Sequence, residues 1–310
     1  MAVHSYSPLA RAFHGTLCDM ALSKLSADEH GIILGQLCNA LEPRLAVYFS
    51  SASSGLRLLL TPALLQQLRA DHEVAAALCR KVGTRSCKEL REATAVRWVD
   101  KGLTATDLAT LATLGSVLPA LEVLLIVESA DAAGLDGVQR LAEGLSAGAL
   151  PAVTFLAFAI MHVGDAGASA FAAALGRGAL PRLMSLVLRS AAITNAGLVA
   201  LAPALRQRPA LVCLSLDANL FDDEGLAALV APPPPAGALL TTTGGLKKLK
   251  KLDLESTQVT DAGCAVLASA LDSGALPVLE TISLAGISAS AAAKKAVHAA
   301  VARSSAALPA

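Results

Sequence analysis

The sequence has few aromatic residues and no excess of charge of either sign. Phe, Trp and Tyr make up only 3% of the 310 residues, whereas hydrophobic residues of all kinds reach 54%. A core made from this chain must rely on Leu, Val and Ala, which favours thin, repeated layers. The 25 Lys and Arg residues balance 25 Asp and Glu residues. This balance argues against nucleic acid or an anionic membrane as a partner.

The sequence also lacks cysteines and histidines at the spacings of metal-binding motifs. The six cysteines and six histidines include no Cys-x-x-Cys motif and no close pair of histidines, so the sequence predicts no metal site. Motifs such as G-x-S-x-G, the P-loop and H-E-x-x-H are missing, which predicts neither catalytic residues nor a cofactor. Free cysteines without a pattern are typical of a reducing compartment, and we expect a cytoplasmic or nuclear protein.

No long hydrophobic run continues without interruption. The longest uncharged stretches, residues 144–164 and 225–245, are long enough to span a bilayer. The first contains Pro151 and several glycines, and the second contains four consecutive prolines at 232–235, which do not suit a membrane helix. The first twenty residues also lack the continuous apolar segment of a secretory signal. We therefore expect no membrane segment.

A repeated apolar phrase of the form L-x-x-L-x-L, with Val, Ile or Phe in place of some Leu residues, dominates the rest of the chain. Six copies start at Leu121, Val153, Leu183, Leu211, Leu249 and Leu279, and a weaker copy starts at Ala93. Successive starts lie 28, 32, 30, 28, 38 and 30 residues apart. The alternation of apolar positions predicts one short strand in each copy.

A second phrase follows several of these strands. It consists of a polar or acidic residue, a glycine and an Ala/Leu helix pattern, and its polar residues are Asp165, Asn195, Asp223 and Asp261. We expect each of these side chains to cap the N-terminus of the helix that it begins. A single unit of one strand and one helix cannot bury its own apolar face, so the copies must stack.

These repeats resemble the leucine-rich repeats of the ribonuclease-inhibitor type, in which L-x-x-L-x-L-x-x-N/C-x-[ILV] is followed by a helix. The resemblance covers about residues 93–300. It implies an α/β fold, a curved solenoid with parallel strands on the concave face and helices on the convex face. Only Asn219 matches the Asn position of the motif, and the other copies have Lys101, Ser129, Met161, Ala191 and Thr257 there. We therefore expect an incomplete ladder of Asn side chains.

The repeats divide the chain into two parts. We expect a helical N-terminal region over residues 1–88 and a leucine-rich-repeat domain of about seven repeats over residues 89–303. The spacing of 38 places an insertion loop at residues 231–245. Its prolines at 232–235 are either a ligand for a partner domain that binds polyproline or part of a tolerated surface insertion.

The segment from Leu25 to Leu59 is similar to an F-box, although Ser26 replaces the usual Pro of that family. An F-box ahead of leucine-rich repeats implies a substrate receptor of a cullin-type ubiquitin ligase, with Leu25, Ile33 and Leu37 facing the adaptor subunit. The alternative is a helical cap that shields the apolar edge of the first repeat, because the ends of solenoids need covering.

The residues that flank the second and third apolar positions of each strand should point into the concave face. Several of them are apolar in the second and third repeats and charged in the later ones. An apolar patch on a surface that should be wet marks an interaction site. The predicted partner-binding residues are Val123, Leu125, Val127, Phe155, Val187, Arg189, Asp217, Lys251, Asp253 and Glu255. The alternatives are that the N-terminal segment covers the first rows or that the patterning is loose.

These observations predict a non-enzymatic module that binds a protein partner on its concave surface. Three roles fit this prediction. The first is the F-box-type receptor, and the second is a stand-alone scaffold or inhibitor. The third is a GTPase-activating protein on the same fold, which needs an exposed arginine such as Arg189 at the rim.

Overall fold

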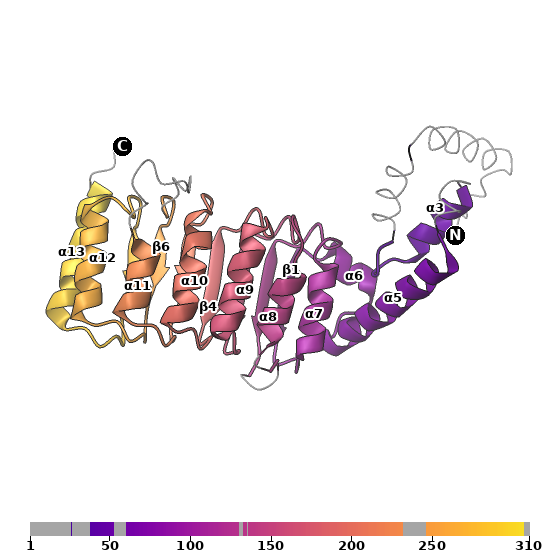
Figure 1. Cartoon of the computed structure of the whole chain (residues 1–310), viewed down its shortest axis with the longest axis horizontal. Helices are drawn as coiled ribbons and strands as arrows, with labels where there is room; N and C mark the ends of the chain where they lie inside the picture. The colour runs from indigo at the N-terminus through magenta and orange to yellow at the C-terminus, as the bar shows by residue number, and fades with distance from the viewer. Residues whose placement is uncertain are drawn as a thin grey trace, which may run out of the picture. The chain divides into compact units, whose positions relative to one another are not determined.

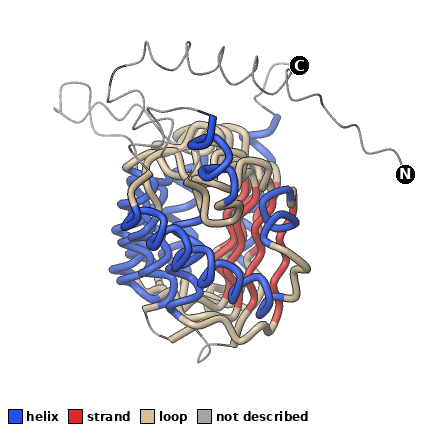
Figure 2. The backbone as a smooth tube through the Cα atoms, turned by 90° about the vertical axis from the view of Figure 1, so that its right-hand side faces the viewer, coloured by secondary structure: helices blue, strands red, loops and turns tan. Residues whose placement is uncertain are grey.

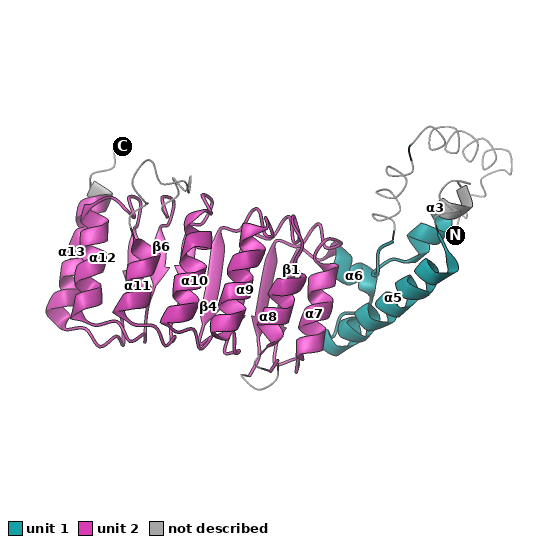
Figure 3. Ribbon diagram, viewed as in Figure 1, with its two compact units in different colours: residues 1–91 teal, residues 92–310 magenta. Residues whose placement is uncertain are grey.

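The chain forms two compact units, residues 1–91 and 92–310 (Figure 3), whereas the sequence places the boundary at residue 88. The computed structural model describes residues 26, 38–52, 60–129, 133–134, 136–231 and 246–306. The candidate adaptor-facing residues Leu25, Ile33 and Leu37 lie outside the described residues, as do the prolines at 232–235.

The described part of the first unit is helical. It contains α3 (Arg44–Ala52) and α5 (Pro62–Val82), and α6 (Cys87–Glu92) runs to the boundary. Helix α5 begins after Thr61, whose hydroxyl accepts a hydrogen bond from the amide of Leu64. It ends at Gly83, which has a left-handed φ of 83°. These are common start and stop signals of an α-helix.

Strands and helices alternate along the second unit. They are β1 (Ala95–Val99), α7 (Ala105–Leu114), β2 (Val123–Val127), α8 (Gly137–Gly144), β3 (Phe155–Ala159), α9 (Gly164–Gly176), β4 (Ser185–Arg189), α10 (Asn195–Arg206), β5 (Cys213–Ser215), α11 (Asp223–Val230), β6 (Lys251–Asp253), α12 (Asp261–Asp272), β7 (Thr281–Ser283) and α13 (Ala291–Ala306) (Figure 1). The seven described strands form one parallel sheet in sequence order.

The strands and the repeat helices lie on opposite sides of the second unit (Figure 2; strands red, helices blue). Parallel strands pack about 4.8 Å apart, whereas neighbouring helices need about 8 to 10 Å. The helical side is therefore the wider one, and the sheet lies on the concave side. The curved α/β leucine-rich-repeat solenoid predicted from the sequence is confirmed.

Alternating burial in the strands explains how the sheet meets the helices. In β1, Val96 and Trp98 are buried whereas Arg97 between them is exposed. The weaker copy of the repeat that starts at Ala93 therefore forms a strand, as its pattern predicts. The alternating apolar positions of each strand point toward the helices, and the residues between them lie on the opposite face, where the small Ala157 and Ala159 are also buried.

The helices contribute leucine at helical spacing and alanine where they approach the sheet. In α10, for example, Leu198, Leu201 and Leu205 are buried and recur every three to four residues. Burying one such leucine stabilises the fold by about 1.5 to 3 kcal/mol. Large rings are rare in this layer; Phe158 and Phe171 meet edge to face with their centroids 6.4 Å apart.

In α9 to α12 the polar residue of the repeated phrase caps the helix of the next repeat, not its own, so the sequence-based prediction is wrong. The carboxylate of Asp165 accepts hydrogen bonds from the Thr194 amide at 2.8 Å, the Thr194 hydroxyl at 2.6 Å and the Gly197 amide at 3.0 Å. Asn195, Asp223 and Asp261 accept in the same way from the amides of Asp222, Thr260 and Ser290. We call each such contact an inter-repeat cap.

The side chains that cap their own helices lie one residue earlier. The hydroxyl of Thr194 accepts from Ala196, the carboxylate of Asp222 from Glu224, and the hydroxyl of Thr260 from Ala262. A residue already inside the first turn lies beside the neighbouring helix. This position explains why the acidic residue of the phrase reaches across to the next repeat.

The glycine of the same phrase makes room for the inter-repeat cap. A Cβ atom at Gly197 would lie 3.1 Å from the Cα atom of Asp165, and one at Gly225 would lie 2.8 Å from Oδ1 of Asn195. Glycine at these two positions therefore allows the helix of the preceding repeat to approach closely. The last repeat has Ala293 three residues after its cap, Ser290.

Asn219 holds the turn after β5 in the way that the repeat motif predicts. Its Nδ2 donates to the carbonyls of Leu188 and Leu216 at 2.7 and 2.8 Å, and its Oδ1 accepts from the amides of Ala191 and Ile193 at 3.2 and 3.1 Å. The side chain is 2% exposed. One amide therefore ties two adjacent repeats together.

Two other residues take over part of this role. The hydroxyl of Thr257 donates to the Leu254 carbonyl at 2.8 Å, which matches the contact of Asn219 with the carbonyl three residues before it. The buried carboxylate of Glu128 accepts from the amides of Lys101 and Gly102 in the preceding repeat, at 2.8 and 3.0 Å. Glu128 lies one residue before the Asn position, so the motif does not reveal it.

Candidate functional site

The side chains on the open face of the sheet, which the repeat helices do not cover, form columns that run across the strands. Val123 pairs with Phe155, Leu125 with Ala157, and Val127 with Ala159, and the same register continues to β7. The structure places all ten sequence-predicted residues on this face, on β2 to β4 and on or just after β5 and β6.

The first part of this face is largely apolar, apart from the exposed Arg97, which the register places opposite Leu125. We define the apolar patch as Val99, Val123, Leu125, Val127, Phe155 and Val187; Val99 is 48% exposed and the others are half-buried. Ala157, which the register places between Leu125 and Val187, is only 1% exposed. The larger side chains of the flanking strands thus cover the small one between them and form a continuous surface.

Ile160 adds an apolar residue that the strand pattern does not reveal. It follows β3 directly, has a left-handed φ of 61° and is 53% exposed. Asp100, Ser190, Ala218 and Ser256 have positive φ values at the equivalent place. The strand alternation ends at this turn, so periodicity gives no information about which side chain is exposed there.

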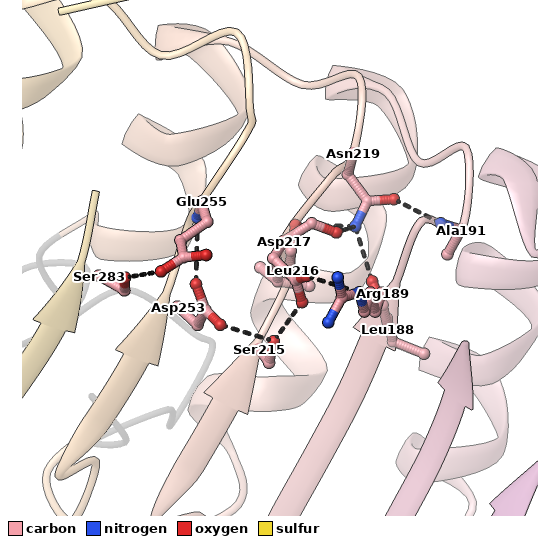
Figure 4. A network of polar contacts seen from close by, with 10 residues as sticks. All are labelled: Leu188, Arg189, Ala191, Ser215, Leu216, Asp217, Asn219, Asp253, Glu255 and Ser283. Atoms are coloured by element: carbon pink, nitrogen blue, oxygen red, sulfur yellow. Dashed lines mark hydrogen bonds and ion pairs between the residues drawn. The ribbon is translucent and has the colours of Figure 1, made fainter. Parts of the chain in front are cut away.

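Arg189 and Asp217 form an ion pair next to the apolar patch (Figure 4). Nε of Arg189 lies 3.1 Å from Oδ2 of Asp217, and the hydroxyl of Ser215 donates to Oδ1 of the same carboxylate at 2.6 Å. Asp217 is 6% exposed. A nearly buried carboxylate needs such partners, because desolvation of an unpaired charge is costly.

Asp253 and Glu255 lie beside this pair, at the end of β6 (Figure 4). Oδ1 of Asp253 accepts from the Glu255 amide at 3.1 Å, and the hydroxyl of Ser283 donates to the Glu255 carboxylate. Burial raises the pKa of Asp253, and the negative charges of Asp217 and Glu255 raise it further, against the opposing effect of its hydrogen bonds. We call Asp217, Asp253 and Glu255 the acidic end of the open face.

The described residues show no group of three or more His, Cys, Asp or Glu side chains that could hold a metal ion. Helices of the length and apolarity needed to cross a membrane are likewise not found in the part of the chain that the structure describes. The side chains of the open face offer apolar contacts and charge pairing.

Comparison with known proteins finds one leucine-rich repeat in the second unit. The family profile described as Leucine Rich repeat matches residues 245–268, which include β6 and the first part of α12. Among solved structures, the chain is similar to an internalin from Listeria monocytogenes, with 16% sequence identity and a TM-score of 0.31. The alignment covers 62% of this chain and 61% of the internalin chain, less than two thirds of its length. None of the curated proteins matches the chain significantly.

The matched repeat, the seven described parallel strands and the alternating helices fit a curved α/β leucine-rich-repeat fold. Such repeats generally bind protein partners. The fold thus supports a protein-interaction module, and the open face of the sheet is its candidate binding surface.

Proposed function

We propose that the protein is a non-enzymatic module that binds a partner protein on the open, concave face of its sheet. The observation that carries this proposal is the apolar patch, since six apolar side chains gather on the face that the repeat helices leave uncovered. A contiguous apolar surface on a soluble domain marks an interaction site.

The arrangement of this face has the properties of an interface. Phe155 and Leu125 are large apolar anchors at the centre of the patch, and a protein interface draws most of its energy from a few such residues. The strands fix these side chains in register before binding, which lowers the entropic cost of association. Charged residues at one edge favour one orientation of the partner.

Site-specific photo-crosslinking tests this proposal and does not require the partner to be identified first. A photoreactive amino acid replaces Leu125 in one variant and Val266 in another; Val266 is 39% exposed on α12. We expect a defined crosslinked protein from the Leu125 variant only. Equal crosslinking at both positions, or a product at Val266 alone, would show that the concave face is not the binding surface.

Within this function, the F-box-type receptor is one role, and the pattern of residues 25–59 is what supports it. A pull-down with the ligase adaptor compares the wild-type chain with the variant Ile33→Ala/Leu37→Ala. Adaptor binding by the wild type that the variant loses supports the receptor role. If the wild type does not bind the adaptor, the role as a stand-alone scaffold or inhibitor replaces it.

Separate observations bear on the type of repeat, on the cell compartment and on the role as a GTPase-activating protein. Repeats of 28 to 32 residues outside the insertion, each with a helix, support the ribonuclease-inhibitor-like type. Free thiols at Cys38, Cys79, Cys87, Cys213 and Cys264 support a cytoplasmic or nuclear protein. The ion pair of Arg189 with Asp217 favours a structural role over that of a GTPase-activating arginine. Stimulated GTP hydrolysis that Arg189→Ala abolishes would reverse this last assignment.

A further inference from the structure

We propose that the partner contributes an extended segment in which large apolar residues lie about five residues from a Lys or Arg. The apolar residues pack on the apolar patch, and the cation pairs with Asp253 and Glu255. This inference rests on the proposed function, because it assigns the chemistry of the partner at the same concave face.

The two halves of this surface are neighbours in the sheet. The apolar patch occupies β1 to β4, and the acidic end follows on β5 and β6. Three strand spacings, or about 14 Å, separate the strand of Phe155 from that of Asp253. The register places Lys251 opposite Phe155, so Asp253 also lies about 7 Å further along the strand and about 16 Å from Phe155 in all. An extended chain advances about 3.3 Å per residue, so about five residues cover this distance.

The charges of the acidic end are only partly compensated within the protein. Arg189 pairs with Asp217, whereas the charged groups that shift the pKa of Asp253 are the carboxylates of Asp217 and Glu255. Lys251 lies two residues before Asp253, about 7 Å along the strand. A cation from the partner would therefore relieve repulsion between carboxylates.

The surroundings make this pairing stronger than an ordinary surface contact. Asp253 and Glu255 are half-buried, and hydrogen bonds from the Glu255 amide to Asp253 and from the Ser283 hydroxyl to Glu255 orient their side chains. A charge pair in a partly desolvated, ordered site is stronger than one in open water. An acidic partner, in contrast, would add a like charge to a carboxylate whose pKa is already raised, so charge complementarity selects a basic one.

Selection from a phage-displayed library of random dodecapeptides on the full chain tests this inference. We expect enriched peptides to carry at least two large apolar residues and a Lys or Arg at the stated spacing. The variant Asp253→Asn/Glu255→Gln should bind these peptides about fivefold more weakly. The control Asp71→Asn/Glu73→Gln makes the same charge change on α5, where both side chains are exposed, and should bind them as the wild type does.

The outcomes separate this inference from the proposed function. Circular dichroism checks that the variants Leu125→Lys and the milder Leu125→Ser are folded. If the enriched peptides are apolar, contain no basic residue and no longer bind these variants, the inference is overturned and the concave site stays in place. Peptides that bind these Leu125 variants as well as the wild type would overturn both. The inference is also overturned if acidic peptides are enriched or if no peptide is enriched. The same holds if basic peptides bind the variant Asp253→Asn/Glu255→Gln as well as they bind the wild type.

Discussion

Asp165 of one repeat caps the helix that Thr194 of the next repeat begins. Its carboxylate accepts hydrogen bonds from the Thr194 amide at 2.8 Å and from the Thr194 hydroxyl at 2.6 Å. The negative charge lies at the N-terminus of α10, where the helix dipole stabilises an anion. Stability in repeat proteins comes largely from contacts between neighbours, and the inter-repeat cap is one of these contacts.

Replacing the glycine that makes room for this cap should destabilise the protein. In Gly197→Ala the new methyl group would lie 3.1 Å from the Cα atom of Asp165 and would also contact its carboxylate. We expect a loss of about 1 to 3 kcal/mol in the free energy of unfolding, measured by urea denaturation. The helix propensity of alanine, which favours the substitution by about 1 kcal/mol, does not compensate for this contact.

Gly176→Ala is the matched control for this substitution. Gly176 ends α9, and a Cβ atom there would meet nothing within 4 Å. It should leave the stability unchanged or increase it by up to about 1 kcal/mol. The double variant Asp165→Ala/Gly197→Ala should lose less than the sum of the single losses, because the contact of the methyl group with the carboxylate is removed while that with the Cα atom remains. Equal effects of the two glycine substitutions would contradict this account.

The buried amide of Asn219 should be costly to remove. Asn219→Ala leaves two amides and two carbonyls of adjacent repeats without this partner. We expect a loss of about 3 kcal/mol, since each unsatisfied buried group costs about 1 to 3 kcal/mol and some will find water. Thr257→Val removes one hydrogen bond and should cost about 1 kcal/mol. Similar costs for the two variants would contradict the bridging role of Asn219.

Asp253→Asn should stabilise the protein at neutral pH. The pKa of Asp253 is raised in the folded state, so the folded protein binds this proton more tightly than the unfolded chain. Ionisation therefore costs stability as the pH rises from the ordinary Asp value of about 3.9 through the raised folded value. We expect a gain of a few tenths of a kcal/mol at pH 7, reduced by solvent screening, and none at pH 3.

Urea denaturation at both pH values measures this difference. Asp272→Asn provides a control of opposite sign, because the carboxylate of Asp272 accepts two hydrogen bonds from Nη2 of Arg303 at 2.9 and 3.0 Å. Its loss should lower the stability at pH 7 by up to about 1 kcal/mol. A destabilising effect of Asp253→Asn at pH 7 would show that its hydrogen bonds outweigh the repulsion.

The thiol of Cys79 should resist alkylation in the folded protein. Burial, followed by its hydrogen bond and charge interaction with Cys87, raises the pKa of Cys79 to about 12. Since the thiolate is the reactive form, the rate of labelling by iodoacetamide should increase about tenfold per pH unit from pH 7 to 9.5 without a plateau. Half-buried Cys213 should react before buried Cys79, as mass spectrometry of each site can show. A plateau for Cys79 below pH 9.5 would contradict the raised pKa.

The spacing of leucines predicts the fold because each apolar position has the same environment in every repeat. Leu186, Leu214 and Leu252 are paired across adjacent strands, so one pattern fixes both the strand and its register. The three columns of the open face follow from the same alternation. Val96 and Trp98 allow even the weaker first copy to be recognised as a strand.

Contacts between repeats are less predictable, since they depend on which neighbour a side chain reaches. Asp165 carries the residue type of a helix cap, but only its place beside α10 shows that Thr194 is the partner. Glu128 holds the turn of the preceding repeat although it lies one residue away from the Asn position. Ala157 belongs to a column of the open face, yet the larger Leu125 and Val187 on the flanking strands bury it.

The inter-repeat cap gives the repeat array a direction of growth. Helix α10 receives a cap from the preceding repeat at the amide of Gly197, and its Asn195 supplies the cap for the next helix. A unit of this kind can therefore be duplicated within the array with its contacts complete. The last repeat has Ala291 at the position where α9 to α12 have Asp or Asn. Duplication of an inner unit therefore lengthens the array with its caps in place, whereas a copy of the final unit would supply no cap to the helix that follows it.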